Sequence, residues 1–267
     1  MSLRKPEPRS DRKAVLLSTR ILDLIDIPAA IGLLTRLPVP LNSDHVMARG
    51  ALAAWAYPVV GALIGGIAAA VAAVFLWFGV VPVIVAVLVV VLQVVLTGAM
   101  HEDGLADSAD GLWGAYDRDR RLEIMKDSHI GVYGVIALTL SLILRCAALS
   151  VLLSSLPVYL LIALGALSRV PMVALMHGLA NARKTGLASS VGRPPASKVI
   201  LAAILAFAIT VLILPSAVIL LIGLMILCTV AVGYVARAKI GGQTGDILGA
   251  SQQITECVLL ISLTTLL

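Results

Sequence analysis

Long apolar runs separated by short polar stretches make up most of the chain after residue 50. The run from Ala51 to Met100 contains no charged residue. About 20 apolar residues are enough for a helix to cross a bilayer, so a run of this length is too long for one span. The Phe-Gly-Val-Val-Pro stretch at 78–82 is a turn signal. We therefore predict two membrane helices that meet at this turn.

The same pattern recurs twice along the chain. Residues 130–178 predict a second hairpin that turns at 154–157, and the uncharged run 199–236 predicts a third that breaks near Pro215. A final segment, 247–267, is long enough for a seventh span although it contains Glu256. The expected fold is all-α: a polytopic membrane helical bundle of six or seven transmembrane helices in hairpins, with short cytoplasmic amphipathic helices.

The first 50 residues differ from the rest of the chain. Residues 1–26 carry many charges and lack the apolar core of a signal peptide. The apolar patch Ile27–Leu34 is too short to span, and Pro38 and Pro40 follow it. We expect 1–50 to be a cytoplasmic segment with an interfacial or re-entrant helix, and 51–267 to be an integral membrane catalytic domain.

Composition and charge agree with a membrane protein. Of 267 residues, 60% are hydrophobic and 13% are charged, whereas soluble domains are about half apolar and a quarter charged. The net charge is +5, but the basic residues are spread over the loops, so nucleic acid is not an expected partner. The three predicted hairpin turns carry no Lys or Arg, which places the other loops in the cytoplasm. The three cysteines are isolated in apolar stretches and indicate neither zinc nor disulfides.

The acidic residues are concentrated in one place. Eight of the fifteen lie between 102 and 127, beginning with His101-Glu102-Asp103. Asp103, Asp107 and Asp110 are spaced i, i+4 and i+7, which aligns them on one face of a helix. Like charges so placed repel, and a hard cation such as Mg²⁺ or Mn²⁺ would relieve the repulsion. The alternative is a solvated acidic helix end, which would favour compensating lysines that are lacking before Arg118.

A second polar stretch, Gly241–Asp246, precedes the last apolar segment. Its glycines would let a ligand approach the backbone, and Asp246 could complete the carboxylate set. An ordinary turn with Asp246 capping the next helix is an equal alternative. Arg145 and Arg169 lie inside apolar segments, where ionisable groups are functional candidates. Pairing with a carboxylate or snorkelling to the interface is an equal alternative.

A third stretch, 117–128, reads as a short amphipathic helix on the membrane surface, with Leu122 and Met125 facing inward. Arg118, Arg121 and Lys126 could hold a phosphate. The alternative for each is an ordinary solvated charge.

Together these stretches resemble the cobalamin synthase family, which comprises membrane-bound adenosylcobinamide-GDP ribazoletransferases. The resemblance spans nearly the whole chain in matching order and spacing and rests on Thr35–Pro40, His101–Gly111, Leu122–Ser128 and Gly241–Asp246 with the following Leu248-Gly249-Ala250. The pairing of His-x-Asp-Gly-x-x-Asp-x-x-Asp-Gly with Gly-Gly-Gln-Thr-Gly-Asp is far more specific than an acidic helix alone.

The resemblance implies a transferase that completes the lower nucleotide loop of cobalamin. The 3′-hydroxyl of α-ribazole, or of its 5′-phosphate, would attack the phosphorus on the corrinoid arm of adenosylcobinamide-GDP, and GMP would leave. The family uses Mg²⁺. The implied metal ligands are Glu102, Asp103, Asp107 and Asp110. The implied catalytic residues are His101 and Asp246, and the implied substrate-binding residues are Arg36, Arg118, Lys126, Gln243 and Thr244.

The sequence leaves two other functions open. CDP-alcohol phosphotransferases of phospholipid synthesis also carry aspartates at helical spacing, but here Gly111 is followed by Leu-Trp-Gly, which fits that pattern less well. A cation transporter would place its carboxylates in the middle of a span, whereas Asp103, Asp107 and Asp110 begin just past the end of the second predicted helix. Membrane lipid is an expected partner, and the sequence leaves the oligomeric state open, a homo-oligomer included.

Overall fold

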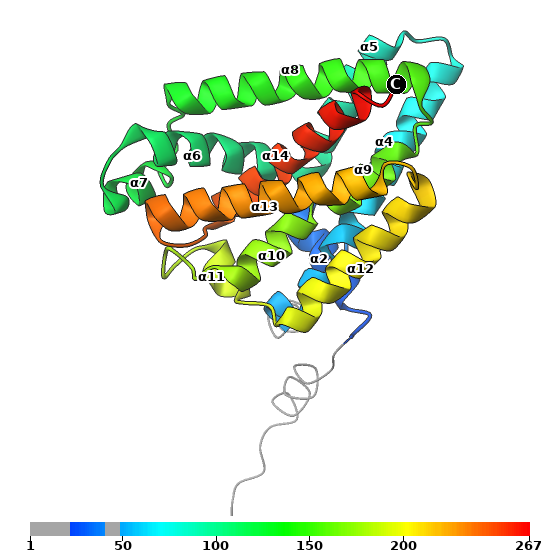
Figure 1. The fold of residues 1–267 in the computed structure, drawn as a ribbon. Coiled ribbons are helices and arrows are strands. Elements are labelled where there is room, and N and C mark those ends of the chain that lie inside the picture. Colours follow the sequence, from blue (N-terminus) through cyan, green and yellow to red (C-terminus); the bar gives the residue numbers. More distant parts are fainter. Residues whose placement is uncertain (1–21, 41–48) are drawn as a thin grey trace, which may run out of the picture.

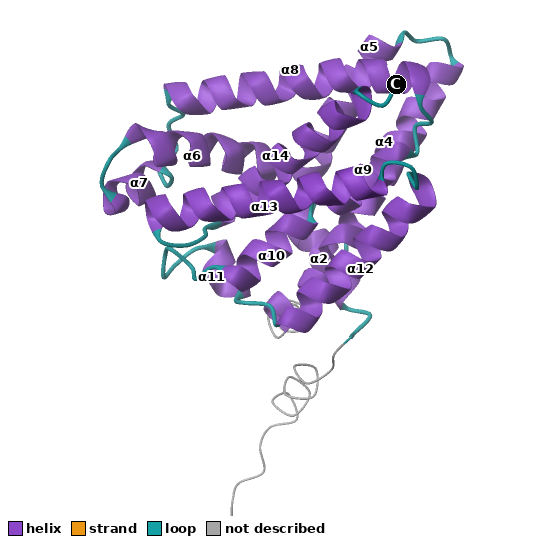
Figure 2. Ribbon diagram, viewed as in Figure 1, coloured by secondary structure: helices purple, strands orange, loops and turns teal. Residues whose placement is uncertain are grey.

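The protein is described by a computed structural model that covers residues 22–40 and 49–267. Helices joined by short loops account for nearly all of this part of the chain, and it contains no β-strand (Figures 1 and 2). The elements in order are α2 Asp26–Leu34, η1 Gly50–Ala56, α4 Tyr57–Trp77, α5 Pro82–Thr97, α6 Met100–Gly114, α7 Arg118–Ile124, α8 Val132–Ser155, α9 Leu160–Leu167, α10 Val170–Gly178, α11 Leu187–Val191, α12 Ala196–Ile213, α13 Val218–Ile240 and α14 Gly245–Thr264.

Six helical stretches are long and apolar enough to cross a membrane. They are η1 with α4, α8, α9 with α10, α12, α13 and α14. A seventh candidate is α5 with α6, which are bent by 88° at their junction. The expected membrane bundle of six or seven spanning helices is confirmed.

The three hairpin turns also fall where they were predicted. α4 ends at Trp77 and α5 begins at Pro82; α8 ends at Ser155; and the break between α12 and α13 contains Pro215. Proline favours the first turn of a helix because its missing N–H is not needed there. In Figure 1 the first and third turns lie at the end of the bundle away from α7 and α11.

The helix that follows the second turn is interrupted, which the sequence pattern did not predict. α9 ends at Leu167 and α10 begins at Val170, with Pro171 in its first turn. Proline lacks the N–H that would continue the helical hydrogen bonds, so the break precedes it. Arg169 at this break donates from Nη1 to the carbonyl of Gly165 at 2.9 Å. The interruption places a guanidinium inside the bundle.

The junction between α5 and α6 turns the chain sharply. Gly98 and Ala99 both adopt left-handed backbone conformations, with φ of 62° and 59°. A side chain at Gly98 would overlap the Arg36 side chain, and the Arg36 N–H donates to the Leu96 carbonyl at 2.7 Å. The bend directs the polar helix α6 against α8 and α14 (Figure 1).

The short helix α2 is built into the same body. Asp26 is fully buried and accepts hydrogen bonds from Arg49 Nε and Nη2, both at 2.6 Å, and from Trp55 Nε1 at 2.7 Å. These bonds tie α2 to η1, and α2 also packs on α4. A helix therefore forms at the predicted patch Ile27–Leu34, while residues 1–21 and 41–48 of the proposed N-terminal segment lie outside the described residues.

Candidate active site

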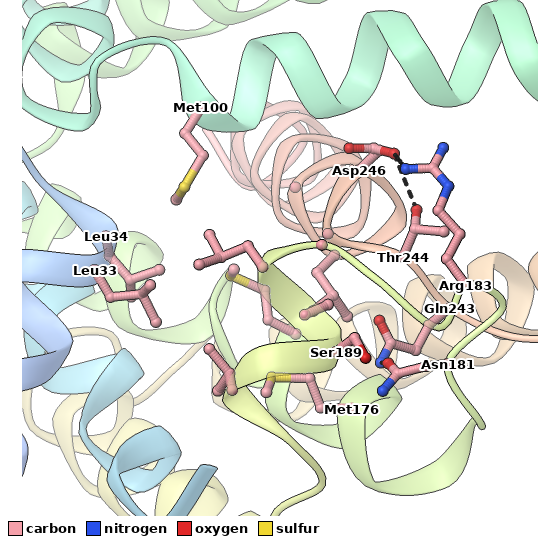
Figure 3. A pocket seen from close by; sticks show the side chains of 18 of the residues that line it. Leu33, Leu34, Met100, Met176, Asn181, Arg183, Ser189, Gln243, Thr244 and Asp246 are labelled. Atoms are coloured by element: carbon pink, nitrogen blue, oxygen red, sulfur yellow. Dashed lines mark hydrogen bonds and ion pairs between the residues drawn. The ribbon is translucent and has the colours of Figure 1, made fainter. Parts of the chain in front are cut away.

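A cavity of about 270 Å³ opens at the end of the bundle where α6 and α14 begin (Figure 3). Its wall comes from α2, α10 and α11, from the start of α14, and from the loop that holds Asn181 and Arg183. Met100 and Asp103 contribute the first turn of α6. Segments far apart in the sequence thus meet around one space.

One side of the cavity is acidic. Asp103 and Asp246 line it, and Asp107 lies one turn further along α6. Partial burial disfavours a negative charge on Asp107, and so do the like charges of Asp103, Asp246 and, least, Asp110, whereas the positive charge of Arg183 favours it. We call Asp103, Asp107 and Asp246 the acidic group. The structure therefore brings Asp246 to two of the predicted carboxylates, although 139 positions separate it from Asp107.

Two glycines allow this approach. A Cβ on Gly104 would lie 2.8 Å from the Asp246 carbonyl oxygen, and a Cβ on Gly249 would lie 3.3 Å from the His101 Cα. Such distances require α6 and α14 to touch through their backbones. Backbone contact thus sets the separation of Asp103 from Asp246.

Arg183 is the basic residue of the cavity wall. Its Nη1 lies 3.2 Å from Asp246 Oδ2, and its Nη2 donates to the Leu122 carbonyl at 3.2 Å. Thr244 caps α14 by accepting from the Ile247 N–H at 3.3 Å, and its hydroxyl also donates to Asp246 Oδ2 at 3.2 Å. Asp246 is held from two sides at the helix N-terminus, where a negative charge is favoured.

The predicted substrate-binding residues Gln243 and Thr244 both line the cavity. Gln243 exchanges backbone hydrogen bonds with the 180–182 segment: its N–H donates to Ala180 and its carbonyl accepts from Ala182, both at 2.8 Å. Its side-chain Nε2 also donates to Asn181 Oδ1. The glycine-rich turn is thereby fastened to the loop that carries Arg183.

His101 and Glu102 lie on the other side of α6, away from the acidic group. Glu102 Oε1 accepts from Arg145 Nη1 at 3.0 Å, and Arg145 Nη2 reaches Glu256 at 3.3 Å and Gln93 at 2.9 Å. His101 is 1% exposed beside this set. Successive helix positions point about 100° apart, so His101 and Glu102 cannot share the face of Asp103 and Asp107. The buried polar network comprises Gln93, Glu102, Arg145, Gln252, Gln253 and Glu256.

Asp110 also forms its hydrogen bonds away from the acidic group. Its two carboxylate oxygens accept from the backbone N–H groups of Gly131, at 2.7 Å, and Gly134, at 2.9 Å. These donors lie at the N-terminus of α8, where N–H groups have no intrahelical partner. Asp110 thus caps α8, and the expected shell of Glu102, Asp103, Asp107 and Asp110 is not assembled in this structure.

None of the three basic residues predicted to bind substrate, Arg36, Arg118 and Lys126, lines the cavity. Arg36 packs at the α5–α6 bend, Lys126 is exposed after α7, and Arg118 donates from Nε to the Ile240 carbonyl at 2.8 Å. Arg118 therefore caps the end of α13. The sequence pattern did not predict a role for Arg183 or Asn181. The sequence feature that could have indicated one is their position in a polar loop between two apolar spans.

The donor atoms of the acidic group are of the kind that Mg²⁺ prefers. Within 22–40 and 49–267, no set of three or more His, Cys, Asp or Glu side chains converges as a complete metal site. Mg²⁺ is commonly held by one or two carboxylates together with substrate phosphates and water. The carboxylates of Asp103, Asp107 and Asp246 fit that kind of site.

Comparison with known proteins decides the family. The model of a family described as cobalamin-5-phosphate synthase matches residues 26–264. The chain belongs to the cobalamin-5-phosphate synthase family. This confirms the resemblance read from the motifs, and the match does not support the phospholipid-enzyme or transporter alternatives.

Relatives of the chain are named adenosylcobinamide-GDP ribazoletransferase. The protein from Azorhizobium caulinodans is 41% identical over 249 residues, which cover 89% of this chain and 94% of the relative. Those from Bradyrhizobium diazoefficiens and Sinorhizobium medicae are both 40% identical, covering 89% and 88% of this chain and 92% and 94% of the relatives. No solved structure matches the chain.

Proposed function

We propose that the protein is an adenosylcobinamide-GDP ribazoletransferase that joins adenosylcobinamide-GDP to α-ribazole, or to its 5′-phosphate, with release of GMP. The observation that carries this proposal is the cavity of the membrane bundle, at which Asp103 and Asp246 meet. The names of the relatives support a ribazole transfer from adenosylcobinamide-GDP, and the release of GMP is part of our proposal.

Asp103 and Asp107 of the acidic group are the proposed place for Mg²⁺, which is commonly held by one or two carboxylates. When bound, the metal ion supplies positive charge to the diphosphate, which phosphoryl transfer requires more than covalent help. Arg183 is the charged donor that can orient a phosphate oxygen, since a guanidinium presents several N–H groups in a fixed fork. Its ion pair with Asp246 keeps both side chains at the cavity.

The transfer itself exchanges one phosphorus–oxygen bond for another. The 3′-hydroxyl oxygen of the nucleoside bonds to the phosphorus on the corrinoid arm, and the bridging oxygen leaves with GMP. The proton of that hydroxyl goes to a carboxylate of the acidic group. Asp246 is our choice for this proton acceptor, because Thr244 and Arg183 hold its side chain in place at the cavity wall.

The polar loops and the cavity are proposed to face the cytoplasm of a bacterial cell with an inner membrane. α7 and α11 lie at the end of the bundle away from the first and third hairpin turns (Figure 1). Residues of α11 line the cavity. Basic residues are concentrated in the loops at the end that holds α7 and α11, as expected for a cytoplasmic face.

The test is an assay of the purified protein in detergent with adenosylcobinamide-GDP, α-ribazole and Mg²⁺. We expect GMP and a complete corrinoid nucleotide to form in equal amounts, and the rate to fall when Mg²⁺ is chelated and to return when it is restored. GMP released without nucleoside incorporation would indicate a hydrolase, and no release with either acceptor would refute the proposal.

A further inference from the structure

The cavity changes character from one end to the other. In Figure 3, Leu33, Leu34 and Met100 lie at one end, and Asp246, Thr244 and Arg183 lie at the other. The apolar wall, as we define it, comprises Leu33, Leu34, Met100, Met172, Met176 and Val191. A ligand that fits must be apolar at one end and polar at the other.

The size of the cavity limits the occupant. Its volume of about 270 Å³ is below the roughly 300–1,000 Å³ of pockets that enclose drug-sized molecules. One bicyclic aromatic base fits such a space, whereas a corrin macrocycle is several times larger and must remain outside. Of the substrates in the proposed reaction, the candidates are the guanine of the GDP arm and the benzimidazole of α-ribazole.

Polarity distinguishes these two bases. Guanine carries a carbonyl, an amino group and a ring N–H, and burying such groups without partners is unfavourable. The apolar wall offers hydrocarbon and thioether groups, whereas Asn181, Gln243, Thr244 and Arg183 line the side of the cavity away from Leu33 and Leu34 (Figure 3). The Ser189 hydroxyl donates to the Lys184 carbonyl at 3.0 Å, and the Gln243 side-chain amide donates to Asn181 Oδ1. The base of α-ribazole is a dimethylbenzimidazole, which carries two methyl groups and one free ring nitrogen. The phenol of Tyr57 on the cavity wall is a suitable donor to that nitrogen.

The methionines add a reason for an aromatic occupant. Three of the seven in the chain, Met100, Met172 and Met176, line this cavity. Methionine side chains adapt to the shape of a ligand and make favourable contacts with aromatic rings. Met172 and Met176 are 4% and 2% exposed and stand one turn apart on α10, so they form a continuous surface.

We propose that the apolar wall is the binding site for the benzimidazole base of α-ribazole, with Met176 as a specificity-determining residue. A base in this position directs its ribose hydroxyls to the acidic end of the cavity, where the transfer takes place. The corrinoid then approaches the same end from outside the cavity. This inference rests on the proposed function for the identity of the nucleoside.

The experiment measures binding and catalysis separately, with full-length protein in detergent. Equilibrium dialysis gives the Kd of α-ribazole and of its analogue with unsubstituted benzimidazole, and GMP release gives a KM for each substrate. Loss of two buried methyl groups should weaken binding roughly ten-fold. Met176→Ala should weaken α-ribazole binding by a similar factor, reduce the difference between the two nucleosides, and leave the KM for adenosylcobinamide-GDP within two-fold.

Met225→Ala is the matched control. Met225 is 7% exposed and packs in the core cluster that includes α13, and it does not line the cavity. The control should leave both nucleoside affinities unchanged even if it lowers stability. If Met176→Ala fails to accumulate, the two nucleosides still decide the matter with the unaltered protein.

Two results would overturn the inference. Equal affinity for the two nucleosides would show that the methyl groups are not buried, and a raised KM for adenosylcobinamide-GDP with unchanged α-ribazole binding in Met176→Ala would place guanine in the cavity. Failure of the proposed function looks different. In that case α-ribazole binds with the expected methyl preference and no GMP is formed.

Discussion

Arg145 and Glu102 form a buried ion pair, with Arg145 Nη1 lying 3.0 Å from Glu102 Oε1. Arg145 belongs to α8 and Glu102 to α6, and Glu256 of α14 joins the pair at 3.3 Å. The buried polar network thus connects the three helices on a different side of α6 from Asp103. It fixes the rotation of α6, so it determines that Asp103 is presented to the cavity.

Arg145→Met should destabilise the protein strongly. The substitution leaves the carboxylates of Glu102 and Glu256 buried without their cation, and breaking a buried pair in this way costs about 3–5 kcal/mol. Thermal unfolding in detergent measures the loss. Arg120→Met is the control, because it removes an exposed pair with Glu123 whose side chains are 66% and 65% accessible, and such pairs contribute little. Equal melting temperatures for the two variants would contradict the structural role of Arg145.

Asp103→Asn should lower the rate of GMP release at least about 100-fold, comparable to the loss of a major electrostatic contribution to catalysis. The amide keeps the size of the side chain but removes the charge that a metal ion needs. The rate is measured at saturating Mg²⁺ on protein shown to be folded. Glu123→Gln, an exposed carboxylate outside the cavity, should retain nearly full activity. Near-normal turnover by Asp103→Asn would remove this residue from the site.

Asp107→Ala and Asp246→Ala should be strongly non-additive. If both carboxylates serve one metal ion or one bound substrate, either loss disables the unit, and the second adds little. The double-mutant cycle is scored on GMP release from membranes that contain equal amounts of folded protein. Multiplying losses would indicate two separate roles, and a fully active Asp246→Ala would leave Asp246 with only a capping role.

Gly104→Ala should impair activity through helix packing alone. The added Cβ would lie 2.8 Å from the Asp246 carbonyl oxygen and 3.2 Å from the Gly249 Cα. Overpacking of this kind costs about 1–3 kcal/mol, and it separates Asp103 from Asp246. Gly223→Ala is the matched control in α13, because no atom other than those of its chain neighbours and its own helix backbone lies within 4 Å of its added Cβ. That variant should be active and no less stable, since alanine favours a helix over glycine. Equal activities would show that the α6–α14 contact tolerates expansion.

Reporter fusions should divide the loops between two sides of the membrane. Fusions at Gly79, Pro157 and Pro215 should give the signal of the outer side, and fusions at Asp117, Lys184 and Lys239 that of the cytoplasm. The prediction follows from the distribution of basic residues along the loops. A cytoplasmic signal at any of the first three positions would overturn the proposed orientation.

Most of the fold could be predicted because hydropathy directly reports the length of a membrane span. All three hairpin turns were located from Gly, Pro and Ser positions, and the helix at Asp103–Asp110 from its spacing. The break between α9 and α10 could have been suspected from Pro171. The sharp bend before α6 could not, because it depends on left-handed conformations at Gly98 and Ala99, and alanine rarely adopts one.

The sequence predicted only some of the residues that line the candidate site, because the partner of each carboxylate depends on contacts between distant segments. Asp103, Asp107 and Asp246 were expected to act together, and the structure brings them together. Glu102 and Asp110 were grouped with them by proximity in sequence, yet their partners are Arg145 and the start of α8. The hydrogen-bond partner of each carboxylate is set by segments that are distant in the sequence and pack beside it in the fold. Arg183, in a loop without periodicity, gave no comparable signal.

The contact of α6 with α14 at Gly104 and Gly249 also has a practical consequence for handling the protein. The acidic group is divided between two helices, so it exists only while their backbones touch. A detergent that loosens this contact can abolish turnover while every helix remains intact. Circular dichroism would then report a sound preparation of an inactive protein, and the choice of detergent should be guided by turnover rather than by helical content.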